Sequence, residues 1–452
     1  MSDLTEAHSP GSNGVDVGGD GTADAKPRTI SRRLAAIIVA IALVGGGTGA
    51  AIALSSVSSG AQDPASAVDN LLSAADHSDA LGVLDAIAPG ERQAIEPGFS
   101  DLVNQLERLG VLSQGTNLSD IAGLTLHFSK VALTTRTLTP DLVAVSITGG
   151  TVTETVDPAK FPIGTFVDQF APSVIRGAVR SETAPVRTGS SAIVTEDVNG
   201  SWYVSLGYTI VYDALRAKGE SGIPQDLAGE IHPTGAASAD DAVRAFIDNS
   251  AAFNLSGLIG DLAPGEMGAL QTYAPEILGR AESALGNEQS KIHLKVTGMN
   301  LSDSAVNGGT LVKVSDLGLS ASIGAITITI KNGCVSETTV AGTTSHCPSP
   351  ASKSAEARRV LAVLPSSLRP LATRLLTTHP AIGIVALDEG GGWYLSPVAT
   401  ALDDIDAYLS ILQPQDLVAI GDLARNPAEA RALARSLEAI ATSGLTSGSG
   451  LL

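Results

Sequence analysis

Ile87-Ala88-Pro89-Gly90-Glu91 recurs 175 residues later as Leu262-Ala263-Pro264-Gly265-Glu266, and this repeated stretch decides how the chain is organised. The same offset also aligns residues on the N-terminal side of the stretch, such as Val68 with Val243. A match that holds without a gap over this length indicates an internal duplication. The sequence therefore predicts one domain used twice.

A second matching block lies near the end of each copy. Asp197–Ser205 contains Trp202-Tyr203, and Asp388–Ser396 contains Trp393-Tyr394, at an offset of 191 residues. The two tryptophans of the chain therefore occupy equivalent positions. Because the offset grows from 175 to 191, the second copy must carry insertions between the two blocks.

Within each copy the sequence pattern changes from helix to strand. Each copy opens with apolar residues at three- and four-residue spacing, as in Val68, Leu71 and Leu72, which is typical of an amphipathic helix. Later segments such as 142–147 and 325–330 are β-branched and alternate apolar with polar residues, as half-buried antiparallel strands do. The predicted fold class is α+β, with helices on one face of an antiparallel sheet in each copy. Each copy is also long enough to bury a core of its own.

Residues 34–54 form an apolar run of 21 residues without a charge. About 20 apolar helical residues span a bilayer core. Lys26, Arg28, Arg32 and Arg33 precede the run, and positive charge is retained in the cytoplasm. The sequence therefore predicts a single-pass transmembrane helix in the cell membrane, with a cytoplasmic N-terminus and extracytoplasmic domains.

Two further features of this run bear on its role. Ala51-Ile52-Ala53 has the small-x-small form of a signal-peptide cleavage site, so a cleaved signal peptide is the alternative to a retained signal anchor. Gly45 and Gly49 form one GxxxG motif, which could seat a homodimer of the helix.

Composition shifts divide the rest of the chain. Stretches rich in Gly, Ser, Pro and polar residues mark the tail and the linkers, because they cannot bury enough apolar surface to order themselves. The predicted organisation is a disordered cytoplasmic tail (1–33), a transmembrane helix (34–54), a linker (55–62), repeat 1 (63–218), a second linker (219–236), repeat 2 (237–412), and a C-terminal helix with a flexible tail (413–452).

Charge and motif content exclude several function classes. With 28 Lys+Arg against 47 Asp+Glu, the net charge of −19 would repel phosphate, so no nucleic-acid partner is predicted. The sequence contains no GxSxG, Walker, HExxH or calcium-loop motif, and no two histidines stand at helical ligand spacing. We therefore predict no catalytic activity, no metal and no cofactor.

A few duplicated residues are candidates for a pocket. The aromatic pairs could stack a ligand at the mouth of each sheet, and two histidines lie at roughly matching places in strands; these candidates are Trp202, Tyr203, Trp393, Tyr394, His127 and His293. The alternative is that the aromatics are core residues and the histidines partly buried strand residues. Glu91 and Glu266 are equivalent carboxylates that are either first-turn helix acids or general acid/base groups.

Cys334 and Cys347 are the two cysteines of the chain, 13 residues apart in a Gly/Thr/Ser-rich stretch. An oxidising compartment and an even count favour a disulfide between them. Such a bond would stabilise the fold by about 3 kcal/mol through loop closure.

The opening of each copy, represented by Asp63-Pro64-x-x-Ala67-Val68 and followed by a leucine-rich turn, resembles that of NTF2-like extracytoplasmic domains. The Ala/Gly-rich, Lys-poor composition resembles that of single-pass envelope proteins of actinobacteria. The resemblance covers about 30 residues of each copy and implies a cone-shaped α+β domain. Predicted helices at 163–179 and 354–376 depart from the simplest version of that fold.

The leading functional hypothesis is a non-enzymatic, membrane-anchored envelope protein that binds an unknown envelope protein or an apolar small molecule. A small-molecule carrier or enzyme using a cone-shaped pocket is one alternative. An architectural subunit of a membrane complex is the other.

Overall fold

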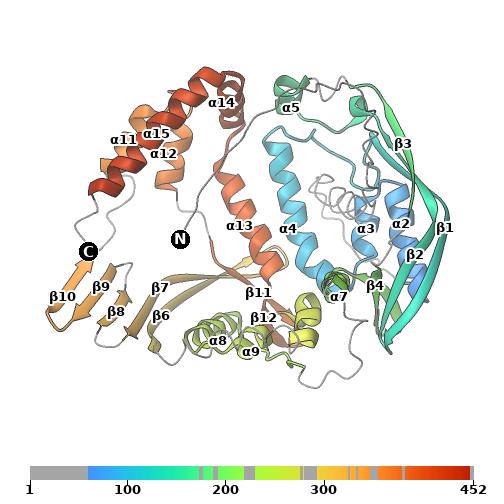
Figure 1. The fold of residues 1–452 in the computed structure, drawn as a ribbon, viewed down its shortest axis with the longest axis horizontal. Coiled ribbons are helices and arrows are strands. Elements are labelled where there is room, and N and C mark those ends of the chain that lie inside the picture. Colours follow the sequence, from blue (N-terminus) through green and yellow to red (C-terminus); the bar gives the residue numbers. More distant parts are fainter. Residues whose placement is uncertain are drawn as a thin grey trace, which may run out of the picture.

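The computed structural model describes residues 60–172, 177–186, 192–217, 230–274, 278, 293–323, 326–331, 334–346, 355–378 and 382–447. These residues form an α+β fold with two sheets in which every strand pair is antiparallel. The first sheet belongs to the first copy and the second sheet to the second copy (Figure 1).

The described strands of the first sheet run in the order β1-β2-β4-β5, and β3 pairs with β2. Their bounds are β1 Leu124–Thr139, β2 Leu142–Val156, β3 Arg180–Pro185, β4 Ile193–Val198 and β5 Ser201–Ser205. The helices of this copy are α2 Pro64–Asp76, α3 Ala80–Asp85, α4 Pro89–Arg108, the 3-10 helix η1 Pro158–Lys160, α5 Thr165–Phe170 and α7 Leu206–Ala217.

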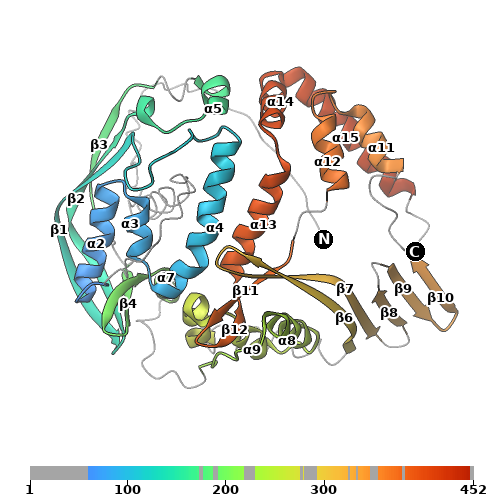
Figure 2. The same ribbon diagram turned by 180° about the vertical axis from the view of Figure 1, so that it is seen from behind.

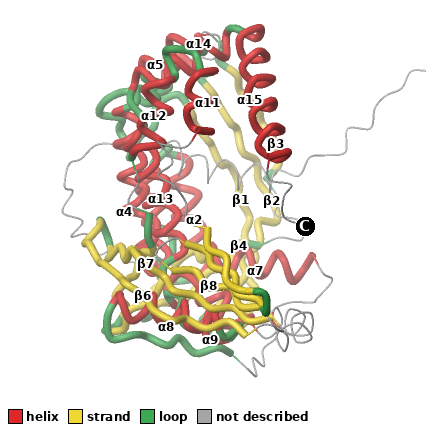
Figure 3. Tube along the Cα trace, turned by 90° about the vertical axis from the view of Figure 1, so that its left-hand side faces the viewer, coloured by secondary structure: helices red, strands yellow, loops and turns green. Residues whose placement is uncertain are grey.

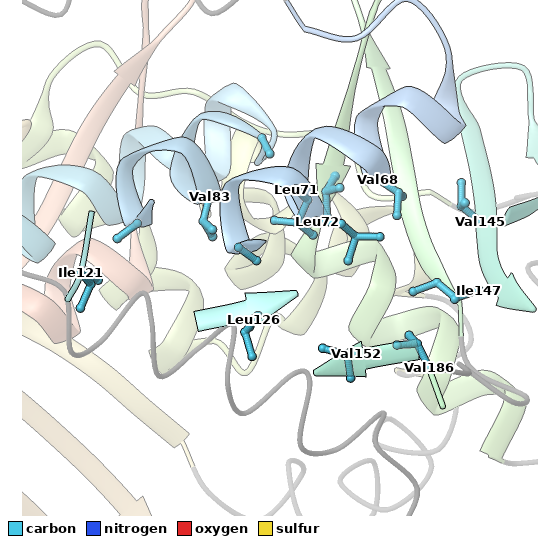
Figure 4. Packing of buried hydrophobic residues seen from close by; sticks show 14 of the residues in the cluster. Val68, Leu71, Leu72, Val83, Ile121, Leu126, Val145, Ile147, Val152 and Val186 are labelled. Carbon is cyan, nitrogen blue, oxygen red and sulfur yellow. The ribbon is translucent and has the colours of Figure 1, made fainter. Parts of the chain in front are cut away.

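Helices α2 and α3 cover one face of the first sheet. The apolar stripe of α2 meets inward-facing residues of β1 and β2, as the close view in Figure 4 shows. The labelled members of this core are Val68, Leu71, Leu72, Val83, Ile121, Leu126, Val145, Ile147, Val152 and Val186. This core fills the space between the two helices and the first sheet.

The described strands of the second sheet run in the order β10-β9-β8-β7-β11-β12, and β6 pairs with β7. Their bounds are β6 His293–Val306, β7 Gly309–Ile323, β8 Ile326–Lys331, β9 Cys334–Thr339, β10 Gly342–His346, β11 Ile384–Glu389 and β12 Gly392–Leu395. The helices of this copy are α8 Ala239–Ala251, α9 Leu255–Gly260, an unlabelled helix over 264–274, α11 Ala355–Val363, α12 Arg369–Thr377 and α13 Pro397–Ile411.

The repeated sequence builds the same local structure in both copies. Asp63 caps α2 and Ser238 caps α8 with nearly identical extended dihedrals, φ −149° and ψ 162° against φ −149° and ψ 163°. An antiparallel bridge joins Ala61 to Trp202, and another joins Ala236 to Trp393. Each bridge fixes the chain entering the first helix against the tryptophan strand.

The third helix of each copy, α4 in the first and helix 264–274 in the second, packs on the sheet of the other copy. Ala94 of α4 lies in the same cluster as Val385 of the second sheet. Tyr273 of helix 264–274 lies in the same cluster as Val194 of the first sheet. Each copy also buries a cluster of its own, under α2 in the first copy and under α8 in the second. The two shared clusters pack the copies against each other.

Helix α4 also runs alongside α13 of the second copy, as Figures 1 and 2 show. The Arg108 guanidinium donates to the carbonyl oxygens of Leu409 at 2.8 Å and Leu412 at 2.9 Å. Gln105 Nε2 donates to Asp406 Oδ1 at 2.9 Å. These bonds fix the C-terminal half of α4 to α13.

Helix α4 and helix 264–274, which each pack on the sheet of the other copy, touch at their N-termini. A Cβ atom on Gly265 would lie 2.7 Å from the Gly90 Cα atom, which is backbone and cannot move aside. We therefore expect Gly265→Ala to destabilise the protein by about 2 kcal/mol through overpacking.

Gly268, three residues further along the same helix, provides the control. Its nearest neighbour to a new Cβ would be the Tyr208 hydroxyl at 3.7 Å, an ordinary contact. Gly268→Ala should therefore stabilise by about 0.5–1 kcal/mol through helix propensity. Urea denaturation of both variants measures the two effects, and a shift of the same sign in both would contradict the close approach.

The helices at the C-terminal end form a separate group. Helices α14 Pro414–Arg425 and α15 Pro427–Ser447 pack with α11 and α12 at the end of the molecule opposite α8 and α9 (Figure 3). Arg374 of α12 pairs with Asp416 of α14, and the Arg425 guanidinium stacks 4.5 Å from the centre of the Phe170 ring of α5. The group is thus tied to both copies.

The predicted fold class included a transmembrane helix, and this part needs a correction. Among the described residues, no helix is both long enough and apolar enough to cross a membrane. The longest of these helices are amphipathic, with charged side chains such as Arg92 and Arg108 on α4. The predicted span 34–54, with Gly45 and Gly49, lies outside the described residues, as does the tail 1–33.

Of the predicted disulfide between Cys334 and Cys347, only Cys334 lies in the described residues, and it is not a free thiol. Cys334 begins β9, but Cys347 lies outside the described residues. The described residues therefore contain no cysteine pair. The Gly/Thr/Ser-rich stretch after Cys334 forms strands β9 and β10, which are joined by a ladder of backbone pairs.

Candidate functional site

The aromatic pairs lie beside two shallow hollows, one in each copy. Trp202 and Tyr203 line the first hollow together with Asn70 and Asp85. Arg92 pairs with Asp85 at 2.9 Å, so the carboxylate of this hollow already has a cation.

The second hollow lies at the start of α8. Trp393 lines it together with Asp240, Asp303 and Thr310. Tyr394 does not line this hollow; it packs instead against the cluster that contains Val385.

Most of each aromatic side chain belongs to the packing of its copy. Trp202 packs against the cluster under α2, and Trp393 packs against the cluster under α8. Tyr203 is buried, and its hydroxyl oxygen accepts a hydrogen bond from the Gly60 amide at 3.0 Å. Trp202, Tyr203 and Trp393 therefore form walls of open hollows rather than of a closed pocket.

The two candidate histidines lie away from these hollows. His127 of β1 is exposed and its Nδ1 lies 3.3 Å from Asp76 Oδ1. His127 pairs with Thr153 of β2. The part of β2 that pairs with β4 ends at Val145, eight residues away from Thr153. His293 begins β6 at the end of the sheet remote from β11. The structure therefore does not bring the histidines and the tryptophans together.

Glu91 and Glu266 have the clearest role of the duplicated polar residues. Glu91 is buried in the first turn of α4. Its Oε1 accepts from Ser205 Oγ and the Gly207 amide, and its Oε2 accepts from the Leu206 amide, each at 2.8 Å. The carboxylate therefore satisfies free donors at the N-terminus of α7, where the helix dipole also favours negative charge.

Glu266 makes the equivalent contacts in the second copy. It accepts a short hydrogen bond from Ser396 Oγ and a 2.8 Å bond from the Val398 amide at the start of α13. Burial raises the pKa of Glu266 and of Glu91, and the hydrogen bonds they accept oppose that rise. Both carboxylates join one helix to the start of another.

Sequence reasoning missed a further pair of residues in this arrangement. Thr209 Oγ1 donates to the Ser205 carbonyl at 2.6 Å and accepts from the Val194 amide at 2.9 Å. Thr400 makes the same two contacts, with Ser396 at 2.7 Å and Val385 at 2.9 Å. Extending the 191-residue offset four positions past the serines would have found this pair.

Glu196 of β4 has the most perturbed carboxyl group. It lies on the face of the first sheet that also carries Val194, toward α7 and helix 264–274. Burial, then the charges of Glu91 and Asp141, raise the pKa of Glu196 to about 7. Among the described residues, no Lys or Arg nitrogen lies within ion-pair distance of it.

Tyr208 lies in the same region and links the copies. Its hydroxyl lies 3.2 Å from Thr272 Oγ1 of helix 264–274. Burial chiefly, with the nearby charge of Glu196 adding to it, raises the pKa of Tyr208 to about 12. Neither Glu196 nor Tyr208 lines the hollows described above.

A narrow cleft between α4 and α13 contains a third set of acids. Asp101, Asp403 and Asp406 line it, and it has room for about one water molecule. Burial raises the pKa of Asp101 and of Asp403, and the neighbouring carboxylates add to the rise. No group of three or more His, Cys, Asp or Glu side chains in the described residues is placed to hold a metal ion.

Comparison with known proteins finds no matching family model, no matching curated protein and no matching solved structure. The resemblance to NTF2-like envelope domains therefore stays a prediction.

Proposed function

We propose that this chain is a non-enzymatic binding protein that recognises a protein partner through the second sheet. The surface concerned is the apolar side of β8 and β9, formed by Ile326, Ile328, Ile330 and Val335, which we call the β8–β9 apolar face. Its exposed fractions carry the proposal: Ile326 is 42%, Ile330 37% and Val335 42% exposed.

The register of the ladder gathers these side chains on one side of the sheet. Ile330 pairs with Leu319 of β7 and with Val335 of β9, so the three side chains are cross-strand neighbours. The opposite side carries Ser and Thr, with hydroxyl contacts such as Ser336–Ser345 at 2.8 Å. The apolar side also carries Glu337, which pairs with Ile328. Around it, this part of the sheet is mainly apolar on one side and polar on the other.

In the first copy, the apolar side of the sheet is buried in a core. In the second copy, the apolar side of β8 and β9 is not. Leu126 and Val152 on the first sheet are buried under the α2 cluster. In the second copy α8 packs on β6 and β7, whereas β8, β9 and β10 pack chiefly on one another within the described residues. Exposed apolar groups that gather on one surface are typical of a protein interaction site.

The structural roles of the other candidate residues support a binding role rather than catalysis. Glu91 and Glu266, the duplicated carboxylates, are committed to capping helices. Trp202, Tyr203 and Trp393 line open hollows, and the candidate histidines lie elsewhere. A catalytic role would require a nucleophile and a base to converge on a cavity.

Site-specific photo-crosslinking in the native cell tests this function. A photo-reactive residue at position 330, on the apolar face, should give a discrete adduct with a partner protein. The same residue at position 329, on the polar face of the same strand, should not. Ile326→Thr with Val335→Thr should abolish the adduct at 330. Adducts of equal yield from both faces, or none from either, would reject the proposal.

A further inference from the structure

We propose that strand β10 pairs edge to edge with β10 of a second copy of this chain, so that two second sheets form one continuous sheet. This inference rests on the proposed binding role of the second sheet and adds a second copy of the chain at the edge of that sheet. It is argued from the edge of the sheet, the direction of its backbone groups and its local charge.

Strand β10 is an edge without the usual protection. It has one strand neighbour, β9, among the described residues, and residues 342–345 are exposed. The long edge strand β1 of the first sheet is interrupted by a bulge, where Lys130 has φ 52°. The ladder from β8 to β10 keeps its register throughout. Unprotected, regular edges are the ones that add a further strand.

The hydroxyl contacts across β9 and β10 show which backbone groups point outward. Thr343 contacts Thr338 at 3.0 Å, and Ser345 contacts Ser336 at 2.8 Å, through their side-chain oxygens. Close side chains are a property of the non-hydrogen-bonded pairs of an antiparallel ladder. The N–H and C=O groups of Thr343 and Ser345 therefore point away from β9, toward the open edge.

These outward groups are self-complementary. In an antiparallel pair of two β10 strands, Thr343 of one strand faces Ser345 of the other, and the two Thr344 residues face each other. Each outward N–H then meets an outward C=O, and the pair has the two-fold symmetry common among homodimers. The β8–β9 apolar faces of both copies then lie on the same side of the joined sheet.

Charge directs self-association to this part of the chain. The whole chain has a net charge of −19, which opposes contact between copies. Residues 326–346 hold one lysine, Lys331, and one glutamate, Glu337, so their Lys, Arg, Asp and Glu charges cancel. Charges farther away than about 8 Å are largely screened at physiological salt. The β8–β10 segment can therefore approach its copy without the repulsion that opposes contact elsewhere.

Sedimentation equilibrium of the full chain over a concentration series tests this pairing. The wild type should show a reversible monomer–dimer equilibrium. Ser345→Pro removes an outward N–H that the β9–β10 ladder does not use, so the monomer should stay folded while the dimer dissociation constant rises at least tenfold. Thr344→Val keeps every backbone donor and should dimerise as the wild type does.

A charge-exchange pair tests the same contact without proline. Thr344→Lys places two lysines face to face across the two-fold axis and should weaken the dimer, as should Thr344→Glu. An equal mixture of the two variants should dimerise again. A wild type that stays monomeric at all concentrations, or a Ser345→Pro dimer of unchanged strength, would overturn the proposal.

The two proposals fail separately. A monomeric chain that still gives a partner adduct from position 330 would reject β10 pairing and leave the binding role in place. A photo-reactive residue at 344 that crosslinks to a different protein instead of a second copy would also reject the pairing.

Discussion

Glu91→Ala is expected to lower the free energy of unfolding by about 4 kcal/mol. The substitution removes the acceptor of three hydrogen bonds and leaves the Ser205 hydroxyl and the Leu206 and Gly207 amides without it. A buried donor left unsatisfied costs about 1–3 kcal/mol.

Urea denaturation of three variants measures this effect. Glu266→Ala should lose a similar amount, because Glu266 bonds to Ser396 and Val398 at the start of α13. Gln93→Ala changes an exposed side chain on the same helix and should shift stability by less than about 0.5 kcal/mol. A loss below about 1 kcal/mol in Glu91→Ala would contradict the capping role.

The identity of this carboxylate was visible in the sequence, but its role was not. The Pro-Gly-Glu motif repeats at a fixed offset, so Glu91 and Glu266 stand out as equivalent residues. The donors that Glu91 satisfies lie 114 to 116 residues further along the chain. The periodicity of apolar residues shows which side chains share one face of a helix or strand. It carries no information about a contact between residues more than a hundred positions apart.

The packing of α4 and helix 264–274 on the sheet of the other copy could not be predicted for a related reason. The pattern around Ala94 and Tyr273 shows that each helix has apolar residues to bury, but either sheet could cover them. Val194 and Val385 are equivalent residues, so each sheet offers the same surface to both helices. The close approach of Gly90 to Gly265 places the two helices across from each other, and sequence spacing does not reveal that approach.

The sequence likewise predicts the strand that carries the β8–β9 apolar face but not the exposure of that face. Alternation in 325–330 predicts a strand with one apolar side, and β8 has that pattern. Alternation also implies a core on the apolar side, whereas Ile326 and Ile330 are exposed. Burial depends on which helix covers the strand, and the second copy places α8 on β6 and β7 instead.

Glu196→Gln is expected to stabilise the protein by about 3 kcal/mol at pH 8 and to leave its stability nearly unchanged at pH 4. Burial, then the charges of Glu91 and Asp141, raise the pKa of Glu196 from 4.5 to about 7. Below pH 4.5 the carboxyl is protonated in both the folded and the unfolded chain. Between pH 4.5 and 7 the unfolded chain releases the proton while the folded chain keeps it, so stability falls as pH rises.

At about 1.4 kcal/mol per pKa unit, the shift of Glu196 corresponds to about 3 kcal/mol lost across that window. Glutamine keeps the shape of the side chain and carries no charge, so the variant should lack this part of the pH dependence. Urea denaturation of wild type and variant at pH 4, 6 and 8 measures the difference, in which the titration of other groups largely cancels. Asp120→Asn, at an exposed position, is the control and should leave the slope unchanged. Parallel stability curves for wild type and Glu196→Gln would show that burial and the neighbouring carboxylates do not make Glu196 keep its proton in the folded chain.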